Sequence, residues 1–120
     1  MGSVTNNISS FQDFWEYDPV SNVWTQKAGF GGSSRYGATG FAIYNKGYVG
    51  LGISGFNLNN DLWQYDPVFD SWNQKANMPV QGLSGVNVFV LGNRAYILGG
   101  IDPTQNYSDE LWEYNSNLLQ

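Results

Sequence analysis

The sequence of 120 residues contains no cysteine and no histidine. The absence of cysteine excludes a disulfide framework, a thiolate nucleophile and a cysteine-ligated metal site. The absence of histidine excludes an imidazole general base, and with it a Ser-His-Asp or Cys-His catalytic centre within this chain. We therefore expect a protein that is not an enzyme and that needs no cofactor.

Charged residues are scarce, at 12% of the chain, and only five are basic, so the net charge is −5. This acidic balance opposes binding to nucleic acid and to anionic lipid. No run approaches the ~20 apolar residues of a membrane span. Residues 1–7 also show neither the basic nor the apolar part of a signal peptide. We expect a soluble chain that contacts neither nucleic acid nor membrane, in a compartment that its composition does not define.

Aromatic residues, in contrast, make up 17% of the chain, and an internal repeat places many of them. Residues 14–20 (FWEYDPV) recur 48 residues later as 62–68 (LWQYDPV), and after a further 49 residues, less completely, as 111–115 (LWEYN). The segment 24–28 (WTQKA) recurs as 72–76 (WNQKA), again 48 residues on. Separate landmarks with one period indicate a repeated supersecondary unit.

Each period predicts four antiparallel strands and no helix. The apolar runs 38–45 and 86–93 indicate first strands that are buried on both faces. Two-residue turns at Asn45-Lys46 and Asn93-Arg94 lead to second strands that end in glycine. A polar loop, the Trp-x-Tyr strand, an Asp-Pro turn and a fourth strand with the second tryptophan complete the period.

The order of these landmarks resembles the kelch repeat, which has a period of ~50 residues. The matching features are the doublet Gly99-Gly100, then Tyr17 with Trp24 and Tyr65 with Trp72. The sequence departs from this pattern at Leu51-Gly52, and no tryptophan follows Tyr114. The resemblance implies an all-β fold of kelch-type β-propeller blades, each a four-stranded antiparallel sheet.

On this interpretation the chain holds only part of a propeller, because propellers have 4–8 blades. We expect a partial propeller that is completed by oligomerisation or by a parent chain. A head-to-tail, closed homo-oligomer would supply residues 22–28 of one copy to the last blade of another, and a trimer with six blades is favoured. The expected division is an N-terminal extension at 1–10, a half blade at 11–28, a complete blade at 29–76, a blade without its fourth strand at 77–117 and a tail at 118–120.

The repeated aromatic residues predict the core rather than a sugar-stacking platform, because large rings at matched strand positions supply most of a core between sheets. Glycines at the end of the second strand predict a positive φ or a close backbone approach rather than a phosphate-binding loop, since no phosphate-binding motif surrounds them. These structural residues are Trp15, Tyr17, Trp24, Tyr48, Trp63, Tyr65, Trp72, Tyr96, Gly99, Gly100, Trp112 and Tyr114.

Strand alternation places the short turns at one end of the sheets and the long polar loops at the other, where binding is expected. The candidate ligand-binding residues of these loops are Arg35, Tyr36, Phe56, Asn57, Asn59, Asp102, Gln105, Asn106 and Tyr107. We expect a non-catalytic module for protein binding or scaffolding. A carbohydrate-binding propeller and a purely structural or engineered fragment without ligand are the alternatives. The acidic residues Asp102, Asp109 and Glu110 lack the spacing of a calcium loop, so no metal is expected.

Overall fold

Short strands and tight turns account for most of the chain in the computed structural model, which describes residues 12–119. The expected N-terminal extension at 1–10, Phe11 and Gln120 lie outside the described residues. The strands are β1 (Phe14–Asp18), β2 (Val23–Lys27), β3 (Thr39–Ile43), β4 (Lys46–Gly50), β5 (Ile53–Ser54), β6 (Asn57–Leu58), β7 (Leu62–Asp66), β8 (Ser71–Lys75), β9 (Asn87–Leu91), β10 (Arg94–Leu98) and β11 (Leu111–Asn115). The expectation of an all-β fold is confirmed.

Four antiparallel sheets divide these strands along the chain. The hairpin β1-β2 comes first, the four-stranded sheet has the order β3-β4-β7-β8, and the last sheet has the order β11-β10-β9. Their registers repeat: Tyr17 pairs with Trp24 in the first hairpin as Tyr65 pairs with Trp72 in the four-stranded sheet. In the last sheet Ala95 pairs with Tyr114 as Gly47 pairs with Tyr65, so the 49-residue spacing of the last period leaves the pairing of the second and third strands unchanged.

The hairpin β5-β6 lies in a segment that the sequence predicted as a polar loop. Ile53 pairs with Leu58 and Ser54 with Asn57 across a two-residue turn. Gly55 adopts a φ of 60° in this turn, a conformation that glycine accepts without steric cost. Hydrophobic alternation cannot reveal strands of two residues, which explains why the hairpin was missed.

The first β-turn of each later period also starts one residue earlier than predicted. Ile43 pairs with Lys46 and Leu91 with Arg94, so the turns are Tyr44-Asn45 and Gly92-Asn93. Tyr44 has a φ of 51° and Gly92 a φ of 60°, as hairpin turns that match the twist of their strands require.

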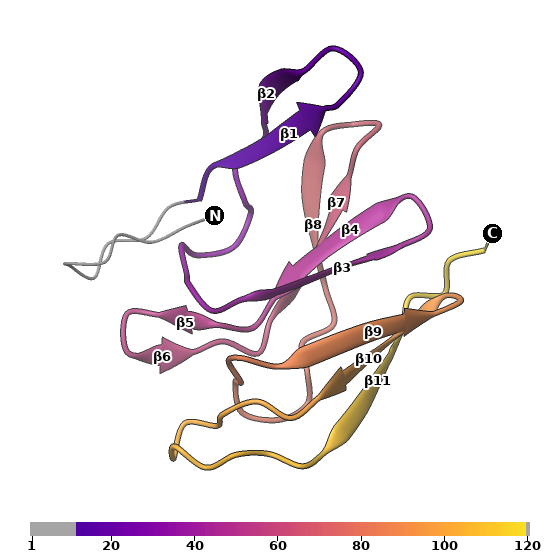
Figure 1. The fold of residues 1–120 in the computed structure, drawn as a ribbon. Coiled ribbons are helices and arrows are strands. Elements are labelled where there is room, and N and C mark those ends of the chain that lie inside the picture. Colours follow the sequence, from indigo (N-terminus) through magenta and orange to yellow (C-terminus); the bar gives the residue numbers. More distant parts are fainter. Residues whose placement is uncertain (1–11, 120) are drawn as a thin grey trace.

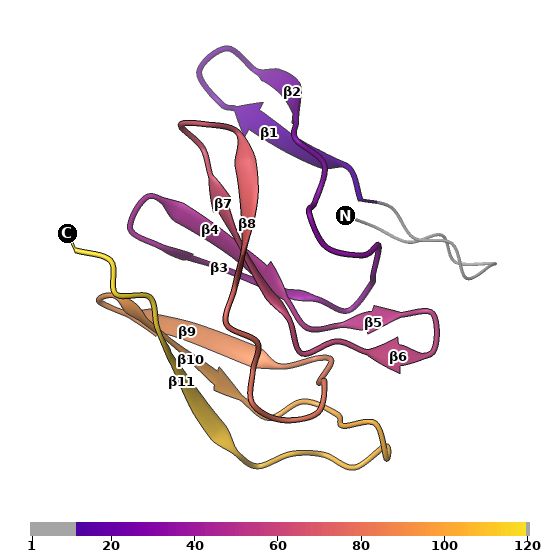
Figure 2. The ribbon, with the colours of Figure 1, turned by 180° about the vertical axis from the view of Figure 1, so that it is seen from behind.

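The core lies between the four-stranded and the three-stranded sheet (Figures 1 and 2). One buried cluster joins Ile43, Tyr48 and Leu62 to Ala95 of β10, and a second joins Leu51, Leu83 and Ile97. The hairpin β1-β2 packs on the opposite side of the four-stranded sheet, where the ring of Phe14 lies 4.8 Å from Tyr65 and 5.1 Å from Trp72. The middle sheet is thus the one covered on both faces.

Some residues predicted for the core are exposed in the described chain. Trp15 is 47% exposed, Trp24 63% and Tyr17 43%, because their side of the β1-β2 hairpin faces away from the four-stranded sheet. The strand β9 likewise alternates between exposed and half-buried residues instead of being buried on both faces. Among the other predicted core aromatics, Tyr48 and Tyr65 are buried, and Trp63, Trp72, Tyr96, Trp112 and Tyr114 are half-buried.

The two ends of the sheets differ as the sequence predicted. In Figure 1 the turns of β1-β2, β3-β4, β7-β8 and β9-β10 lie toward the upper right, and the long loops lie toward the lower left. At the ends of the second strands, Gly52, Gly99 and Gly100 have φ values of 86°, 78° and 94°, a conformation that glycine accepts without steric cost. We call the end with the long loops the loop face.

Candidate functional site

Backbone pairing holds the segments of the loop face in place. Tyr36 and Ile53 exchange two N–H···O bonds, of 3.0 and 2.8 Å, and Ser84 and Ile101 exchange two of 3.2 and 2.9 Å. The link before β3 is thereby joined to the segment after β4, and the link before β9 to the segment after β10. The loop face is therefore a paired scaffold rather than a set of independent loops.

A cavity of about 310 Å³ opens on this face between the β5-β6 hairpin and the loop after β10. Four of the nine predicted ligand-binding residues meet there: Tyr36, Phe56, Asp102 and Gln105. The other lining residues were not predicted from the sequence and are mostly apolar: Ile53, Gly55, Leu58, Ser84, Ile101 and Pro103.

The other loop-face candidates surround this cavity without lining it. Tyr107, 85% exposed, pairs across its loop with Ile101. Asn57 and Asn106 are exposed, and Asn59 is half-buried. The side-chain amide of Asn59 donates to the Ser54 hydroxyl at 2.9 Å and so joins the residue after β6 to β5.

Arg35 differs from the other candidates because its side chain is only 1% exposed. It forms an ion pair with both carboxylate oxygens of Asp61, one at 2.8 Å, and donates to the carbonyl of Leu51 at 3.1 Å. Its guanidinium also lies 4.9 Å from the centre of the Phe30 ring. The structure therefore gives Arg35 a role inside the protein and not a position facing a ligand. It joins the link between β2 and β3 to Leu51, after β4, and to Asp61, directly before β7.

The Arg35 pair also shifts the acid that it contacts. Burial raises the pKa of Asp61, but hydrogen bonds from Arg35 and Trp63 and the charge of Arg35 outweigh burial, so this pKa lies below its ordinary value. The indole of Trp63 donates to Asp61 at 2.9 Å, and Trp15 donates in the same way to Asp13 at 2.8 Å. An acid two residues before each repeated tryptophan was the signal that could have revealed this bond from sequence.

The acidic side chain at the cavity serves its own loop. Asp102 accepts hydrogen bonds from the backbone N–H and the hydroxyl of Thr104, at 2.9 and 2.6 Å, and from the backbone N–H of Asn106 at 3.0 Å. The Thr104 hydroxyl and the Asn106 amide hold the pKa of this carboxyl below its ordinary value. The cavity thus offers a partner mainly apolar surface, and its most accessible apolar side chain is Phe56, which is 94% exposed.

Two other kinds of site are absent from residues 12–119. That range holds no group of three or more Asp, Glu, His or Cys side chains placed to bind a metal ion. It also contains no helix with the length and apolarity to cross a membrane.

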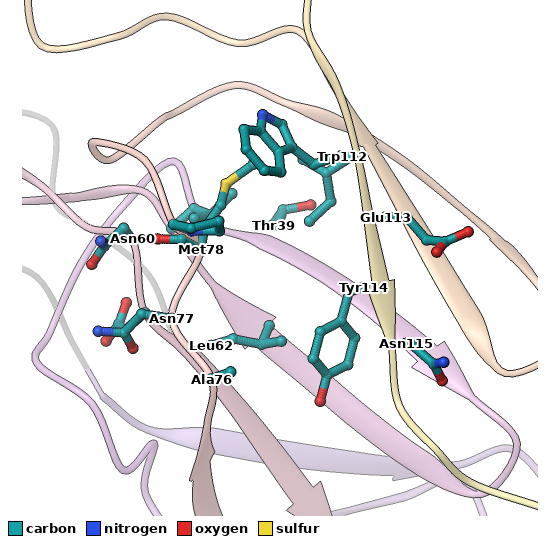
Figure 3. A pocket seen from close by; sticks show the side chains of 14 residues that line it. Thr39, Asn60, Leu62, Ala76, Asn77, Met78, Trp112, Glu113, Tyr114 and Asn115 are labelled. Carbon is teal, nitrogen blue, oxygen red and sulfur yellow. Dashed lines mark hydrogen bonds between the residues drawn. The ribbon is translucent and has the colours of Figure 1, made fainter.

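A second cavity, of about 270 Å³, lies beside β11 (Figure 3). Side chains of β7, β10, β11 and the link after β8 line it. They include Leu62, Ala76, Met78, Pro79, Ile97, Trp112 and Tyr114. The two aromatic residues, Trp112 and Tyr114, were predicted from the sequence as core residues, but a cavity beside them was not predicted.

Comparisons with known proteins give a fold and no family. No family model matches this chain, and no curated protein matches it. Among solved structures, one reported as "Structure of YjhT" is similar, with a TM-score of 0.79 and 18% sequence identity. The match covers 89% of this chain and 40% of the other, so this chain spans less than half the length of that protein. At this identity the similarity shows a shared fold.

Proposed function

We propose that this chain is a non-catalytic, kelch-type β-propeller module that binds a protein partner through its loop face. The observation that carries the proposal is the cavity that brings Tyr36, Phe56, Asp102 and Gln105 together on paired loops. Its lining suits an apolar side chain of a polypeptide, because most of the lining residues are apolar. One carboxylate oxygen of Asp102 is already engaged by three hydrogen bonds within its own loop.

The same proposal includes assembly into a closed propeller. Support comes from the repeated register of the sheets and from the similar structure, of which this chain matches only 40%. A ring of three copies would contain six blades, within the known range of about 4–8. Each copy would then present its own loop face to the same side.

Panning a random-peptide display library against the 120-residue protein tests the binding proposal. Peptides with an apolar anchor should bind, and Phe56→Ala should weaken them about 10-fold, as loss of one interface aromatic does. Phe69→Ala is the matched control, since Phe69 is 77% exposed in the β7-β8 turn at the opposite end. Equal effects of the two substitutions, or no selected peptide, would contradict binding at the loop face.

A carbohydrate ligand is the second candidate. It is favoured by the exposed rings of Phe56 and Tyr107 beside the exposed amide side chains of Asn57 and Gln105. A glycan array on which the wild type binds and Tyr107→Ala does not would support it. A blank array would leave the protein partner as the better proposal.

A further inference from the structure

The cavity beside β11 lies at a strand with one unpaired edge. Within the described residues β11 pairs only with β10, whereas β7, its counterpart one period earlier, pairs with both β4 and β8. The residues after β11 form no strand up to Leu119, and Leu118 packs on the first core cluster. An antiparallel strand could therefore add to β11 as β8 adds to β7.

The four-stranded sheet shows what such a strand brings with it. On β8, the Trp72 ring lies 5.1 Å from Phe14, 5.0 Å from Phe30 and 5.1 Å from Tyr65. Its indole N–H donates to the carbonyl of Ala28 at 3.0 Å. Trp72 thus fills the space between its own sheet, the preceding hairpin and the link that joins them.

One period later, residues equivalent to those around Trp72 line the cavity beside β11. Phe14, Ala28, Phe30 and Gly31 correspond to positions 48 residues on, and Tyr65 to the position 49 residues on. These positions hold Leu62, Ala76, Met78, Pro79 and Tyr114, and every one of them lines the 270 Å³ cavity. Figure 3 shows Leu62, Ala76 and Tyr114 around its lower part, with Met78 next to Trp112 above them. The cavity has the surroundings of a tryptophan on a fourth strand.

The chain itself carries a matching tryptophan strand. β2 repeats the sequence of β8 around its tryptophan, and Trp24 is 63% exposed. Copying the register of Tyr65 with Trp72 would place Tyr114 opposite Trp24 and Glu113 opposite Thr25. Trp24 cannot reach the cavity of its own chain without leaving β1, which lies beyond the opposite face of the four-stranded sheet (Figure 1).

We infer that the cavity beside β11 is the docking site for β2 of a second copy, with Trp24 seated as Trp72 is seated in its own sheet. The inference rests on the proposed closed assembly and gives it a contact. Of the two strands that would compete to pair with β2, β11 is held more firmly. Trp112 and Tyr114 pack on the two core clusters, whereas Trp15 and Tyr17 of β1 are 47% and 43% exposed. In the assembly β11 of the other copy therefore replaces β1 as the partner of β2.

The docking strand β2 and the docking site beside β11 lie on different surfaces. Each copy can therefore accept β2 of one neighbour and donate its own β2 to another. Such head-to-tail contacts close into rings or continue as filaments. Sedimentation of the full chain tests the contact, with an assembly of defined mass expected for the wild type. Trp24→Ala should raise the concentration for half-assembly at least about 30-fold, as expected for an aromatic hot spot. A wild type that stays monomeric at all concentrations would overturn the inference.

Trp15→Ala is the matched control, since Trp15 is 47% exposed on β1, the strand that gives way. We expect it to leave assembly unchanged. An effect as large as that of Trp24→Ala would mean that the intact β1-β2 hairpin docks in place of β11, and would overturn the inferred pairing. Circular dichroism of both variants shows whether the monomer keeps its fold.

Cysteine cross-linking tests the register, because the sequence contains no cysteine. Mixing Glu113→Cys with Thr25→Cys and oxidising should give a disulfide-linked pair of unlike copies, identified by intact mass. Glu113→Cys with Gln26→Cys should not, since neighbouring strand residues point to opposite faces. Cross-linking only in the second mixture would overturn the register. Trp24→Ala spares the loop face and Phe56→Ala spares the cavity beside β11, so failures of assembly and of partner binding are distinguishable.

Discussion

The β1-β2 hairpin and the β7-β8 pair of the four-stranded sheet carry similar sequences. The paired Tyr and Trp side chains of β7-β8 are covered by a neighbouring sheet, whereas those of β1-β2 are not. Tyr17 and Tyr65 donate the same bond, at 2.7 Å, to Asn22 and Asp70 respectively. Tyr65 is 8% exposed and Tyr17 43%. Burial, followed by the bond to Asp70, raises the pKa of Tyr65 to about 12. Local structure thus follows from the repeat itself, whereas burial depends on whether a further layer lies alongside.

The largest effect should come from removing the covered ring. Tyr65→Ala should lower the free energy of unfolding by about 3 kcal/mol, because it empties a packed site beside Phe14 and Trp72. Tyr17→Ala should cost less than about 1 kcal/mol, since its ring packs mainly against Trp24. Urea denaturation of dilute samples measures both. Equal losses would break the comparison and show that the Tyr17 face is covered in solution.

A second test compares Arg35 with Leu83, its equivalent one period later. Leu83 is buried in the second apolar cluster at the position where the first period buries a guanidinium. Arg35→Leu should lower the free energy of unfolding by about 3 kcal/mol, because it leaves the partly buried Asp61 carboxylate unpaired. Adding Asp61→Asn should recover much of this loss. A double variant no more stable than Arg35→Leu would show that the ion pair is not the source of the effect.

The acid side of the stability curve checks the same pair. The pKa of Asp61 is lower in the folded state, so its contribution is present above the ordinary value of 3.8 and is lost as the pH falls through the folded value. Denaturation midpoints measured from neutral pH downward should therefore fall more steeply for the wild type than for Arg35→Leu.

The smallest effects concern the glycines that end the second strands. A Cβ on Gly100 would lie 2.7 Å from the Val86 side chain, at a φ of 94°, so Gly100→Ala should cost about 2 kcal/mol. Gly99, with a φ of 78°, has its nearest neighbour at 3.6 Å, and Gly99→Ala should cost about 1 kcal/mol. Leu51 occupies the position equivalent to Gly99 with a φ of 61°. Thermal unfolding ranks the two variants, and a reversed order would contradict this account.

Much of the fold could be predicted from sequence because the repeat displays it more than once. Matching positions of Trp15, Trp63 and Trp112 predicted the third strands, and alternation along the chain placed the long loops at one end. The β5-β6 hairpin escaped because it depends on a turn at Gly55 and on backbone pairing rather than on hydrophobic periodicity.

The site was predictable in part, for a different reason. Exposed loop residues such as Phe56 and Gln105 do meet at the cavity, since topology brings their loops together. Arg35 has the sequence surroundings of a surface residue, but its partner Asp61 lies 26 residues away. The opening beside β11 becomes visible only when two periods are compared in three dimensions.

The extra residue of the last period has a consequence of its own. Ala95 still pairs with Tyr114 as Gly47 pairs with Tyr65, although one more residue separates Gly100 from Trp112 than separates Gly52 from Trp63. The sheet has accepted an insertion without a shift in register, because loop length adds little to the entropy of closure. The loop face is therefore free to evolve in length and composition, and foreign sequences could be grafted onto it while the strands stay as they are.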